Sequence, residues 1–368
     1  MKIDRIDVYG YDLTYRYGGY AFSGGRVVDT LPSTVVRICT DEGAEGWGET
    51  CPLGPTYLPA HGLGARAALQ QLCPALPGVD PTNLTRVHDA MDSALKGHGY
   101  AKSAVDVACW DLLGKHTGLD VATLLGGRVQ ESVPLYKAVP MDTPEAMRDY
   151  VLARREEGIH RFQLKVGGDP YDDARRTRTV VDALCDEDLV IADANCGWRL
   201  QDAVIAARLM DPLERVLLEQ PCSTLEECIQ VRKHTSLPMV LDEVITDVPM
   251  LLRAHRENGM EAINLKLSRF GGLSGAKRIR DLADALGLRI TVEDTWGGDL
   301  VTAAVAHFAA STKPRQLLTV SYMNDWNVEH IAPDHPRSTG GVGQVPAGAG
   351  LGLNVDPQLL GKPLFSVS

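Results

Sequence analysis

The amino-acid sequence predicts an α/β fold, a (β/α)7β barrel of the TIM type that carries a smaller α+β capping domain. From about residue 133, short and nearly continuous apolar runs alternate with amphipathic helical segments, which is typical of buried parallel strands covered by helices. Eight such runs follow one another, and eight is the number that closes a barrel. The chain of 368 residues is long enough for a barrel of about 250 residues plus a second domain.

The barrel prediction depends on eight strand segments and the helices between them. The predicted strands are Val133–Val139, Phe162–Val166, Leu189–Asp193, Val216–Glu219, Met239–Asp242, Ala262–Lys266, Arg289–Glu293 and Leu317–Tyr322. The predicted helices between them include Glu145–Glu157, Asp202–Leu209, Leu225–Lys233, Val248–Glu257 and Ser274–Leu286.

The first part of the chain has a different pattern. Alternating apolar residues over 1–50, with a turn at Asp41-Glu-Gly43, predict a small antiparallel sheet. Helical periodicity covers roughly 64–75 and 82–117. We therefore place the capping domain at residues 1–130, completed by residues 350–368, and the barrel at residues 131–349.

Three stretches of the sequence lack the periodic pattern of a helix or a strand. Tyr15–Gly25 is rich in glycine and aromatics, which fits either an exposed mobile loop or a lid over a site. Thr50–His61 contains three prolines and cannot form a regular element. Ser338–Gly352 is glycine-rich but lacks the helix that a nucleotide-binding loop requires, so we expect an extended return to the capping domain.

Composition excludes several classes of protein. The formal net charge of −11 disfavours nucleic acid as a partner, because phosphate binding needs a basic surface. Eight cysteines without regular spacing indicate reduced thiols in a cytoplasmic protein. The first residues predict a strand and not a signal peptide, and no apolar run approaches the ~18 residues of a membrane span. We expect a cytoplasmic protein that acts on a small molecule without nucleic acid or a membrane.

A set of five charged residues, which we call the ladder, stands at or near the ends of consecutive predicted strands: Lys165, Asp193, Glu219, Asp242 and Lys266. In a parallel barrel all strand ends point to one rim, where active sites are built. One aspartate there would most often cap a loop, but three clustered carboxylates repel one another unless a cation neutralises them. Oxygen ligands of this kind suit Mg²⁺. The predicted metal ligands are the three carboxylates.

The two lysines flank the carboxylates in sequence. Each alone fits a salt bridge to a carboxylate. Strands two and six of a barrel face each other, however, so Lys165 and Lys266 can approach a substrate from opposite sides. As a pair they fit acid/base groups whose pKa values a nearby metal would lower. The predicted chemistry is removal of a proton α to a carboxylate.

These residues resemble those of the enolase superfamily, in its mandelate racemase and muconate-lactonising group. The likeness spans almost the whole chain, and it implies metal ligands on strands three to five and lysines on strands two and six. The usual strand-two motif is Lys-x-Lys, whereas this sequence has Gln163-Leu-Lys165, so the first, supporting lysine is replaced. The resemblance also implies a homo-oligomer.

The segments Gly46–Tyr57 and Glu293–Asp299 resemble the branch of this family that acts on proline derivatives, either by dehydrating cis-3-hydroxy-L-proline or by epimerising proline betaines. A cyclic ammonium needs carboxylates or aromatic faces, which Asp299 and several other residues could supply, although Trp296 equally fits plain barrel packing. The predicted substrate-binding residues are Tyr57, Gln163, Asn195, Asp294, Thr295 and Trp296.

Two outcomes stay open for the lysine pair. An anti elimination would use Lys165 to take the α-proton and Lys266 to protonate the leaving hydroxyl, with 2-epimerisation of 4-hydroxyproline as a side activity. An epimerase would use the same lysines on a substrate without the 3-hydroxyl. We favour dehydration, because Thr295 and the segment Asp193–Trp198 look closer to that branch. A Schiff-base aldolase would need one lysine and no carboxylate ladder, and a non-catalytic barrel would need neither.

Overall fold

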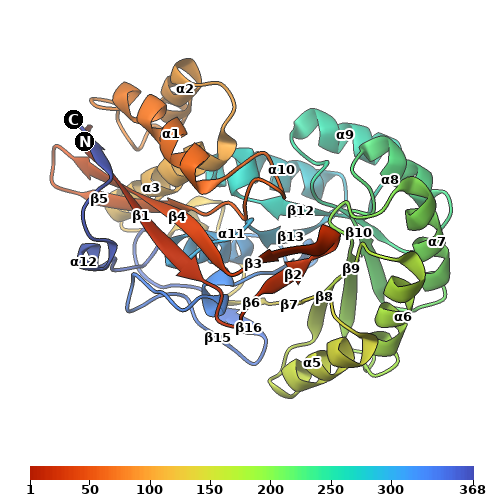
Figure 1. Cartoon of the computed structure of the whole chain (residues 1–368). Coiled ribbons are helices and arrows are strands. Elements are labelled where there is room, and N and C mark those ends of the chain that lie inside the picture. The colour runs from red at the N-terminus through yellow and green to blue at the C-terminus, as the bar shows by residue number, and fades with distance from the viewer.

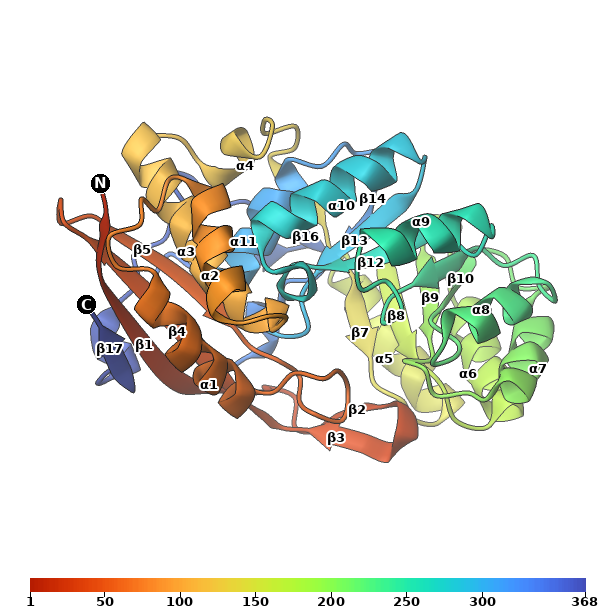
Figure 2. The ribbon, with the colours of Figure 1, turned by 90° about the horizontal axis from the view of Figure 1, so that it is seen from above.

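The computed structural model describes all residues, 1–368, as two lobes (Figure 1). One lobe is an antiparallel sheet with helices packed on one face, and the other is a parallel barrel with helices around it. Figure 2 shows the first lobe lying beside the barrel, with one hairpin reaching across toward it. No helix is both long and apolar enough to cross a membrane.

The sheet of the first lobe has four strands in the order β17-β1-β4-β5. Their bounds are β1 Ile3–Thr14, β4 Thr30–Thr40, β5 Glu45–Thr50 and β17 Phe365–Val367. The C-terminal strand β17 pairs with β1, so the end of the chain adds an edge to the N-terminal sheet, as the two termini in Figure 1 also show. The division into residues 1–130 with 350–368, and 131–349, stays our prediction.

Helices α1 (Gly62–Leu72), α2 (Leu84–Ala94) and α3 (Gly99–Thr117) cover this sheet. The predicted helical stretch 82–117 is interrupted between α2 and α3, because Gly97 and His98 adopt positive φ angles of 69° and 53°. The close approach of α3 to β5 depends on a glycine, since a Cβ on Gly48 would lie 2.0 Å from the carbonyl oxygen of Ala104.

The eight parallel strands of the barrel are hydrogen-bonded in sequence order, as predicted. They are β7 Lys137–Val139, β8 Arg161–Lys165, β9 Leu189–Asp193, β10 Val216–Glu219, β11 Met239–Leu241, β12 Ala262–Lys266, β13 Arg289–Glu293 and β14 Leu317–Val320. A parallel bridge between Leu135, just before β7, and Val320 of β14 joins the two ends of the sheet, so the strands form a barrel.

The helices of the barrel lie on its outer face, as Figure 1 shows for α5 to α9. They are α5 Pro144–Glu156, α6 Pro170–Val181, α7 Leu200–Met210, α8 Leu225–Arg232, α9 Val248–Arg256, α10 Leu273–Ala285 and α11 Asp299–Ala310, and two single turns, α4 Val121–Leu124 and α12 Pro357–Leu360, lie in the connections. Side-chain caps begin most of the long ones; Thr143, for example, accepts from the backbone N–H of Ala146 at the start of α5.

The predicted first strand, Val133–Val139, is wrong as a single element. It divides into β6 (Ser132–Pro134), which pairs with β16 (Val342–Gln344), and β7. Pro134 cannot donate to a second strand, so the chain leaves one sheet there and joins the next. The glycine-rich stretch 338–352 contains the β15 (Ser338–Thr339) and β16 hairpin before the chain returns to the first lobe.

The aromatic stretch Tyr15–Gly25 contains the first strand of a hairpin. The hairpin pairs β2 (Tyr20–Phe22) with β3 (Arg26–Val28). Its fit against the barrel is close, because Ser23 Oγ donates to the carbonyl oxygen of Asn195 at 3.2 Å. Tyr20 and Phe22 are buried. The hairpin therefore covers the barrel rim, and the interpretation as an exposed loop is wrong for its centre.

Candidate active site

The barrel register places three of the five ladder residues side by side at one rim. Lys165 on β8 is paired with Asp193 on β9, and Asp193 is paired with Glu219 on β10. Asp242 follows β11, and Lys266 ends β12. All five side chains are buried. A strand end therefore positions each charged group, and Asp242 completes the set from the first residue beyond its strand.

Lys165 lies against Asp193, with 2.6 Å between Nζ and Oδ2. The other carboxylate oxygen of Asp193 accepts from the backbone N–H of Asn195 at 2.9 Å. Burial alone would lower the pKa of Lys165, but Asp193, Tyr20 and Glu219 together outweigh it and raise the pKa well above the usual value. Asp193 thus both positions the ammonium group of Lys165 and stabilises its charged form.

Lys266 lies between two carboxylates on the other side of the rim. Its Nζ is 2.6 Å from Asp242 Oδ2 and 2.5 Å from Glu293 Oε1. Burial opposes its charge, yet Asp242 and Glu293 raise its pKa above the ordinary range. The two lysines therefore have separate carboxylate partners, and neither lysine shares the partner of the other.

Asp242 is the most heavily bonded of the three carboxylates. Besides Lys266, it accepts from Arg269 Nη2 at 2.7 Å and from the hydroxyl of Tyr57 at 2.9 Å. Burial would raise its pKa, but Lys266 and Arg269 lower it far below the usual range. Asp242 is therefore ionised in this setting.

Glu219 lies between the two lysine pairs. Gln163 Nε2 donates to its Oε2 at 3.0 Å, and Asn264 Nδ2 donates to Oε1. Burial raises the pKa of Glu219 well above its usual value, and the charges of Asp193 and Asp242 raise it further. Two neutral amides do not offset that repulsion, so the ionised form of Glu219 is disfavoured here unless a further cation is present.

The donor set suits a hard divalent cation. Three buried carboxylates with mutually unfavourable charges offer oxygen ligands of the kind that Mg²⁺ prefers. Two further oxygens near them, Asn195 Oδ1 and Asn264 Oδ1, are buried without a hydrogen-bond partner in the protein. These residues therefore fit a bound Mg²⁺.

A pocket opens at this rim of the barrel. Lys165 and Lys266 both line it, together with Asp193 and Glu293, whereas Glu219 and Asp242 are not among the lining residues. Six aromatic residues form part of its wall, which we call the aromatic wall: Tyr20, Phe22, Tyr57, Tyr136, Trp296 and Trp326. The lining thus combines apolar and charged side chains, as small-molecule sites do.

The aromatic wall is a connected cluster. Trp296 lies 5.4 Å from Tyr20 and 5.6 Å from Trp326 between ring centroids, both in edge-to-face arrangements. The indole N–H of Trp296 donates to Asn327 Oδ1 at 2.9 Å. The wall is therefore preorganised by its own contacts, and the barrel-packing interpretation of Trp296 describes only part of its environment.

All six predicted substrate-binding residues line this pocket: Tyr57, Gln163, Asn195, Asp294, Thr295 and Trp296. Several of these side chains already make hydrogen bonds within the protein. Asp294 accepts from the backbone N–H of Ser268 at 3.0 Å, and burial raises its pKa to about 6. The hydroxyl of Thr295 donates to the carbonyl oxygen of Cys51 at 3.1 Å. Their roles toward a substrate stay predictions.

Asp299 lies elsewhere. It is fully buried at the start of α11, where its carboxylate accepts from the backbone N–H groups of Ile331 and Ala332 at 2.8 and 3.1 Å. It does not line the pocket, so it is not placed to contact a substrate ammonium.

The sequence-based site set omitted Tyr20, Phe22, Tyr136, Glu293 and Trp326. Glu293 could have been found by the same rule as the ladder, because it ends β13 and is paired with Lys266 in the barrel register. Tyr136 hydrogen-bonds Glu293 through its hydroxyl. For Tyr20 and Phe22 of the hairpin, the sequence showed only that they lie in a stretch rich in glycine and aromatic residues.

The sequence matches two family profiles. Residues 25–126 match the mandelate racemase / muconate lactonizing enzyme N-terminal domain, and residues 146–359 match the enolase C-terminal domain-like family. The chain belongs to the mandelate racemase and muconate-lactonising family of the enolase superfamily. The predicted family and the barrel with its capping domain are thereby confirmed.

Relatives within this family include dehydratases and racemases. The chain is 45% identical to a cis-3-hydroxy-L-proline dehydratase of Roseibium aggregatum over the full length of both chains. It is 28% identical to an N-succinyl-L-Arg/Lys racemase of Bacillus cereus, covering 85% of each. A mandelate racemase/muconate lactonizing enzyme structure from Roseovarius nubinhibens, complexed with magnesium, is similar with a TM-score of 0.96 at 36% identity, covering all of both chains.

Proposed function

We propose that this enzyme dehydrates cis-3-hydroxy-L-proline to Δ1-pyrroline-2-carboxylate. The observation that carries the proposal is the placement of Lys165 and Lys266 in one small pocket, each paired with its own carboxylate on a different side of the rim. The full-length similarity to a cis-3-hydroxy-L-proline dehydratase supports the choice of substrate.

We propose Mg²⁺ as the cofactor, held by Asp193, Glu219 and Asp242. When bound, it would neutralise the repulsion among these carboxylates and stabilise the negative charge that develops on the substrate carboxylate as the α-proton leaves. Gln163 and Asn264 would orient Glu219 by the hydrogen bonds that they donate to it.

The two lysines divide the proton transfers. In cis-3-hydroxy-L-proline the carboxylate and the hydroxyl share a ring face, so the α-proton and the hydroxyl lie on opposite faces. Neutral Lys165 takes the α-proton, the electron pair of the C2–H bond forms the C2–C3 double bond, and the C3–O bond breaks. Protonated Lys266 gives its proton to the departing oxygen, which leaves as water. The enamine then tautomerises to Δ1-pyrroline-2-carboxylate.

The carboxylates around each lysine support this division. Glu293 and Asp242 both stabilise the charged form of Lys266, which suits a group that must donate a proton. Lys165 has one close carboxylate partner, Asp193. Neutralising the charge of Asp193 would remove the main interaction that keeps Lys165 protonated.

The aromatic wall supports a cationic ring nitrogen. A ring ammonium within about 6 Å of a tryptophan or tyrosine face is attracted to its π electrons, and six aromatic residues line the pocket. The same wall would accept an N-methylated ammonium. The second candidate function is therefore 2-epimerisation of 4-hydroxyproline betaine or proline betaine, with the lysines serving the two faces of C2.

Parallel assays separate these functions. The purified enzyme with Mg²⁺ is incubated with cis-3-hydroxy-L-proline, trans-4-hydroxy-L-proline and proline betaine. The proposal predicts Δ1-pyrroline-2-carboxylate from the first, with slower epimerisation of 4-hydroxyproline. Rapid epimerisation of the betaine without dehydration would favour the second candidate. Covalent trapping by borohydride with substrate would instead indicate a Schiff-base aldolase.

We also propose a cytoplasmic homo-oligomer. All eight cysteines are free thiols, as expected for a reducing compartment, and the family resemblance implies assembly of several copies. Sedimentation velocity of the purified protein measures the assembly directly, and a single monomeric species would contradict this part of the proposal.

A further inference from the structure

The helix that follows the loop at the end of β13 begins inside the protein. All residues of α11, Asp299–Ala310, are buried, and the loop before it carries Thr295 and Trp296 of the pocket. Gly298 occupies the N-cap position, where it has no side chain to bond the free N–H groups of the first turn. Buried N–H groups without partners are unfavourable, so another part of the chain must supply the acceptors.

Glu49 supplies these acceptors from the other lobe. It lies on β5 and is only 2% exposed. Its Oε1 accepts from the backbone N–H of Gly298 at 3.0 Å, and its Oε2 accepts from the backbone N–H of Val301 at 3.2 Å. The hydroxyls of Tyr11 and Ser33 also donate to Oε1, each at 2.7 Å. Glu49 therefore caps a helix that begins 249 residues further along the chain.

The contact leaves no room for a side chain at Gly298. A Cβ on this residue would lie 2.2 Å from the hydroxyl oxygen of Tyr11 and 2.8 Å from Glu49 Oε1. Both distances are shorter than a real Cβ contact, so only a glycine allows the backbone to approach the carboxylate this closely. The lobes are thus fitted to each other at the start of α11.

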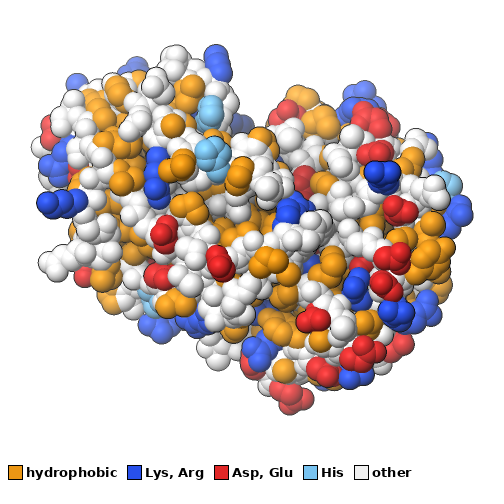
Figure 3. Space-filling model, in the orientation of Figure 1, with side chains coloured by type: hydrophobic (Ala, Val, Ile, Leu, Met, Phe, Trp, Pro, Cys, Tyr) orange, Lys and Arg blue, Asp and Glu red, His pale blue; other side chains and the backbone are white.

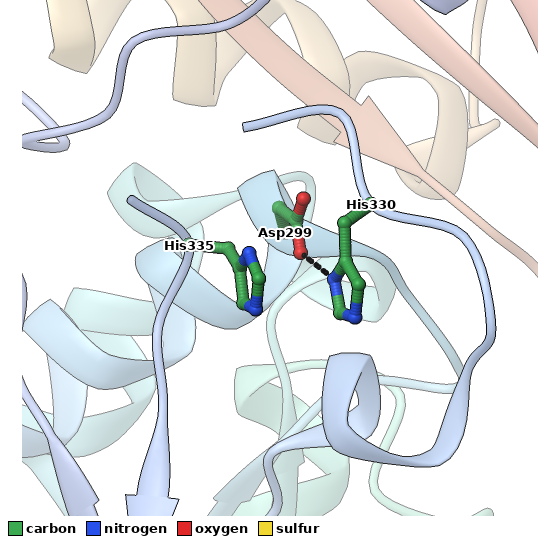
Figure 4. A group of neighbouring side chains, drawn as sticks. All are labelled: Asp299, His330 and His335. Atoms are coloured by element: carbon green, nitrogen blue, oxygen red, sulfur yellow. Dashed lines mark hydrogen bonds and ion pairs between the residues drawn. The ribbon is translucent and has the colours of Figure 1, made fainter. Parts of the chain in front are cut away.

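The next residue, Asp299, bonds a different segment. Its Oδ2 accepts from the backbone N–H groups of Ile331 and Ala332 at 2.8 and 3.1 Å. Figure 4 shows its Oδ1 turned toward His330, whose Nδ1 is 2.9 Å away. Because Asp299 is occupied by this segment, the carboxylate that caps the helix is that of Glu49.

The loop before α11 is bonded to its surroundings along its length. The hydroxyl of Thr295 donates to the carbonyl oxygen of Cys51 at 3.1 Å, and the indole N–H of Trp296 donates to Asn327 Oδ1 at 2.9 Å. Asn327 in turn donates to the carbonyl oxygen of Gly297 at 2.8 Å. With the carboxylate that caps α11, these bonds tie each residue of the loop from Thr295 onward to a segment outside it.

We propose that Glu49 is a positioning residue for the aromatic wall, because it holds the loop from Thr295 to Gly298 against the first lobe. The inference rests on the proposed function, in which this wall contacts the substrate. Glu49 does not line the pocket, so it acts through the loop and not by contact with the substrate. Losing its bonds to the helix start lets Trp296 move, which weakens substrate binding more than it slows the chemical step.

Glu49→Gln tests the proposal while it keeps the shape of the side chain. Both carboxylate oxygens accept from backbone N–H groups, so the NH₂ group of a glutamine must face one of these donors. We expect KM to rise about tenfold and kcat to change less than about twofold. Hydrogen–deuterium exchange should become faster in residues 297–303, with the far-UV circular dichroism unchanged. The KM is measured with whichever of the three assayed proline derivatives the parent converts.

Glu45→Gln is the matched control. Glu45 lies on the same strand, but its carboxylate pairs with Arg37 of the same lobe, so KM and the exchange of residues 297–303 should stay as in the parent. Faster exchange with an unchanged KM in Glu49→Gln would show that Glu49 only stabilises the fold, and would overturn the proposal. Equal exchange in parent and Glu49→Gln would overturn it as well.

Two further outcomes are kept separate from these. A parent that converts a betaine and not hydroxyproline contradicts the proposed function, and the comparison of KM values then uses the betaine. If Glu49→Gln does not fold, exchange in the parent decides, because residues 298–301 should be protected by the cap. Exchange there at the rate of an exposed loop would overturn the proposal.

Discussion

Gln163 Nε2 donates a hydrogen bond to Glu219 Oε2 at 3.0 Å. The two residues stand on β8 and β10, on either side of the strand that carries Asp193. A glutamine therefore occupies the position where the family motif has a lysine, and it contributes a neutral donor in place of a charge. Glu219 keeps a raised pKa, so its ionised form needs a further cation, such as a metal ion, to stabilise it.

Replacing this donor should weaken metal binding. Gln163→Leu leaves the carboxylate of Glu219 with one amide partner fewer, and loss of such an orienting hydrogen bond typically costs about 10–100-fold in metal affinity. We expect the Mg²⁺ concentration for half-maximal activity to rise by that factor. Gln71→Leu, on the exposed face of α1, is the matched control, and an unchanged Mg²⁺ dependence in Gln163→Leu would contradict this role.

Removing divalent ions should abolish activity and leave the fold intact. Lys165, Lys266 and Arg269 already pair with Asp193 and Asp242, so these carboxylates are not left unpaired. We expect EDTA to stop turnover, added Mg²⁺ to restore it, and circular dichroism to stay unchanged. Saturating Mg²⁺ should raise the unfolding free energy by about 3 kcal/mol at a hundredfold excess over Kd. Full activity in EDTA would rule out the metal-dependent account.

Tyr57 should act through Asp242. Its hydroxyl donates to Asp242 Oδ2 at 2.9 Å, and Lys266 Nζ bonds the same oxygen. Tyr57→Phe removes a hydrogen bond to a charged group, which contributes about 1.5–3 kcal/mol, so we expect kcat/KM to fall by about tenfold or more. Tyr171→Phe changes an exposed ring and serves as the control. Kinetics equal to the parent would show that this bond is dispensable.

The sequence predicted those parts of the fold that periodicity specifies. The buried runs of β9 and β10 are continuous and apolar, and the predicted ends of β8 to β10 coincide with the strand ends or lie one residue away. The first strand was misassigned because pairing with β16 depends on residues more than two hundred positions away. Local pattern cannot show which of two sheets receives the residues on either side of Pro134.

The ladder was predictable because each charged residue ends an apolar run, which a single segment of sequence reveals. The aromatic wall was not, since Tyr20, Tyr136 and Trp326 come from three distant segments and meet only when the capping hairpin lies across the barrel rim. Figure 3 shows the outer surface, which is hollowed where the two lobes meet. The side chains that shape the pocket are thus set by how the lobes meet.

His307 should make stability depend on pH. It is fully buried on α11, and Nε2 donates to the carbonyl oxygen of Leu351 at 3.1 Å. Burial lowers its pKa to about 4, whereas an unfolded histidine has a pKa of about 6.5. The unfolded chain therefore binds this proton first as pH falls. The stabilisation is fully present above pH 6.5 and is lost progressively toward pH 4.

Urea unfolding at pH 7.5 and pH 5 measures this effect. Relative to the parent, His307→Gln should remove about 2 kcal/mol of the stability difference between the two pH values. His116→Gln, on the surface, should leave that difference unchanged. A pH dependence in His307→Gln identical to that of the parent would show that His307 does not titrate as its burial requires.

The measurement that tests the central claim most directly is proton NMR of cis-3-hydroxy-L-proline incubated in D₂O with Mg²⁺ and the enzyme. The parent should consume the substrate and form Δ1-pyrroline-2-carboxylate with deuterium at C3, which the tautomerisation introduces. Lys165→Ala should neither exchange the α-proton nor form product, and Lys266→Ala should form no product. Product formation by both variants at the rate of the parent would contradict the two-lysine mechanism.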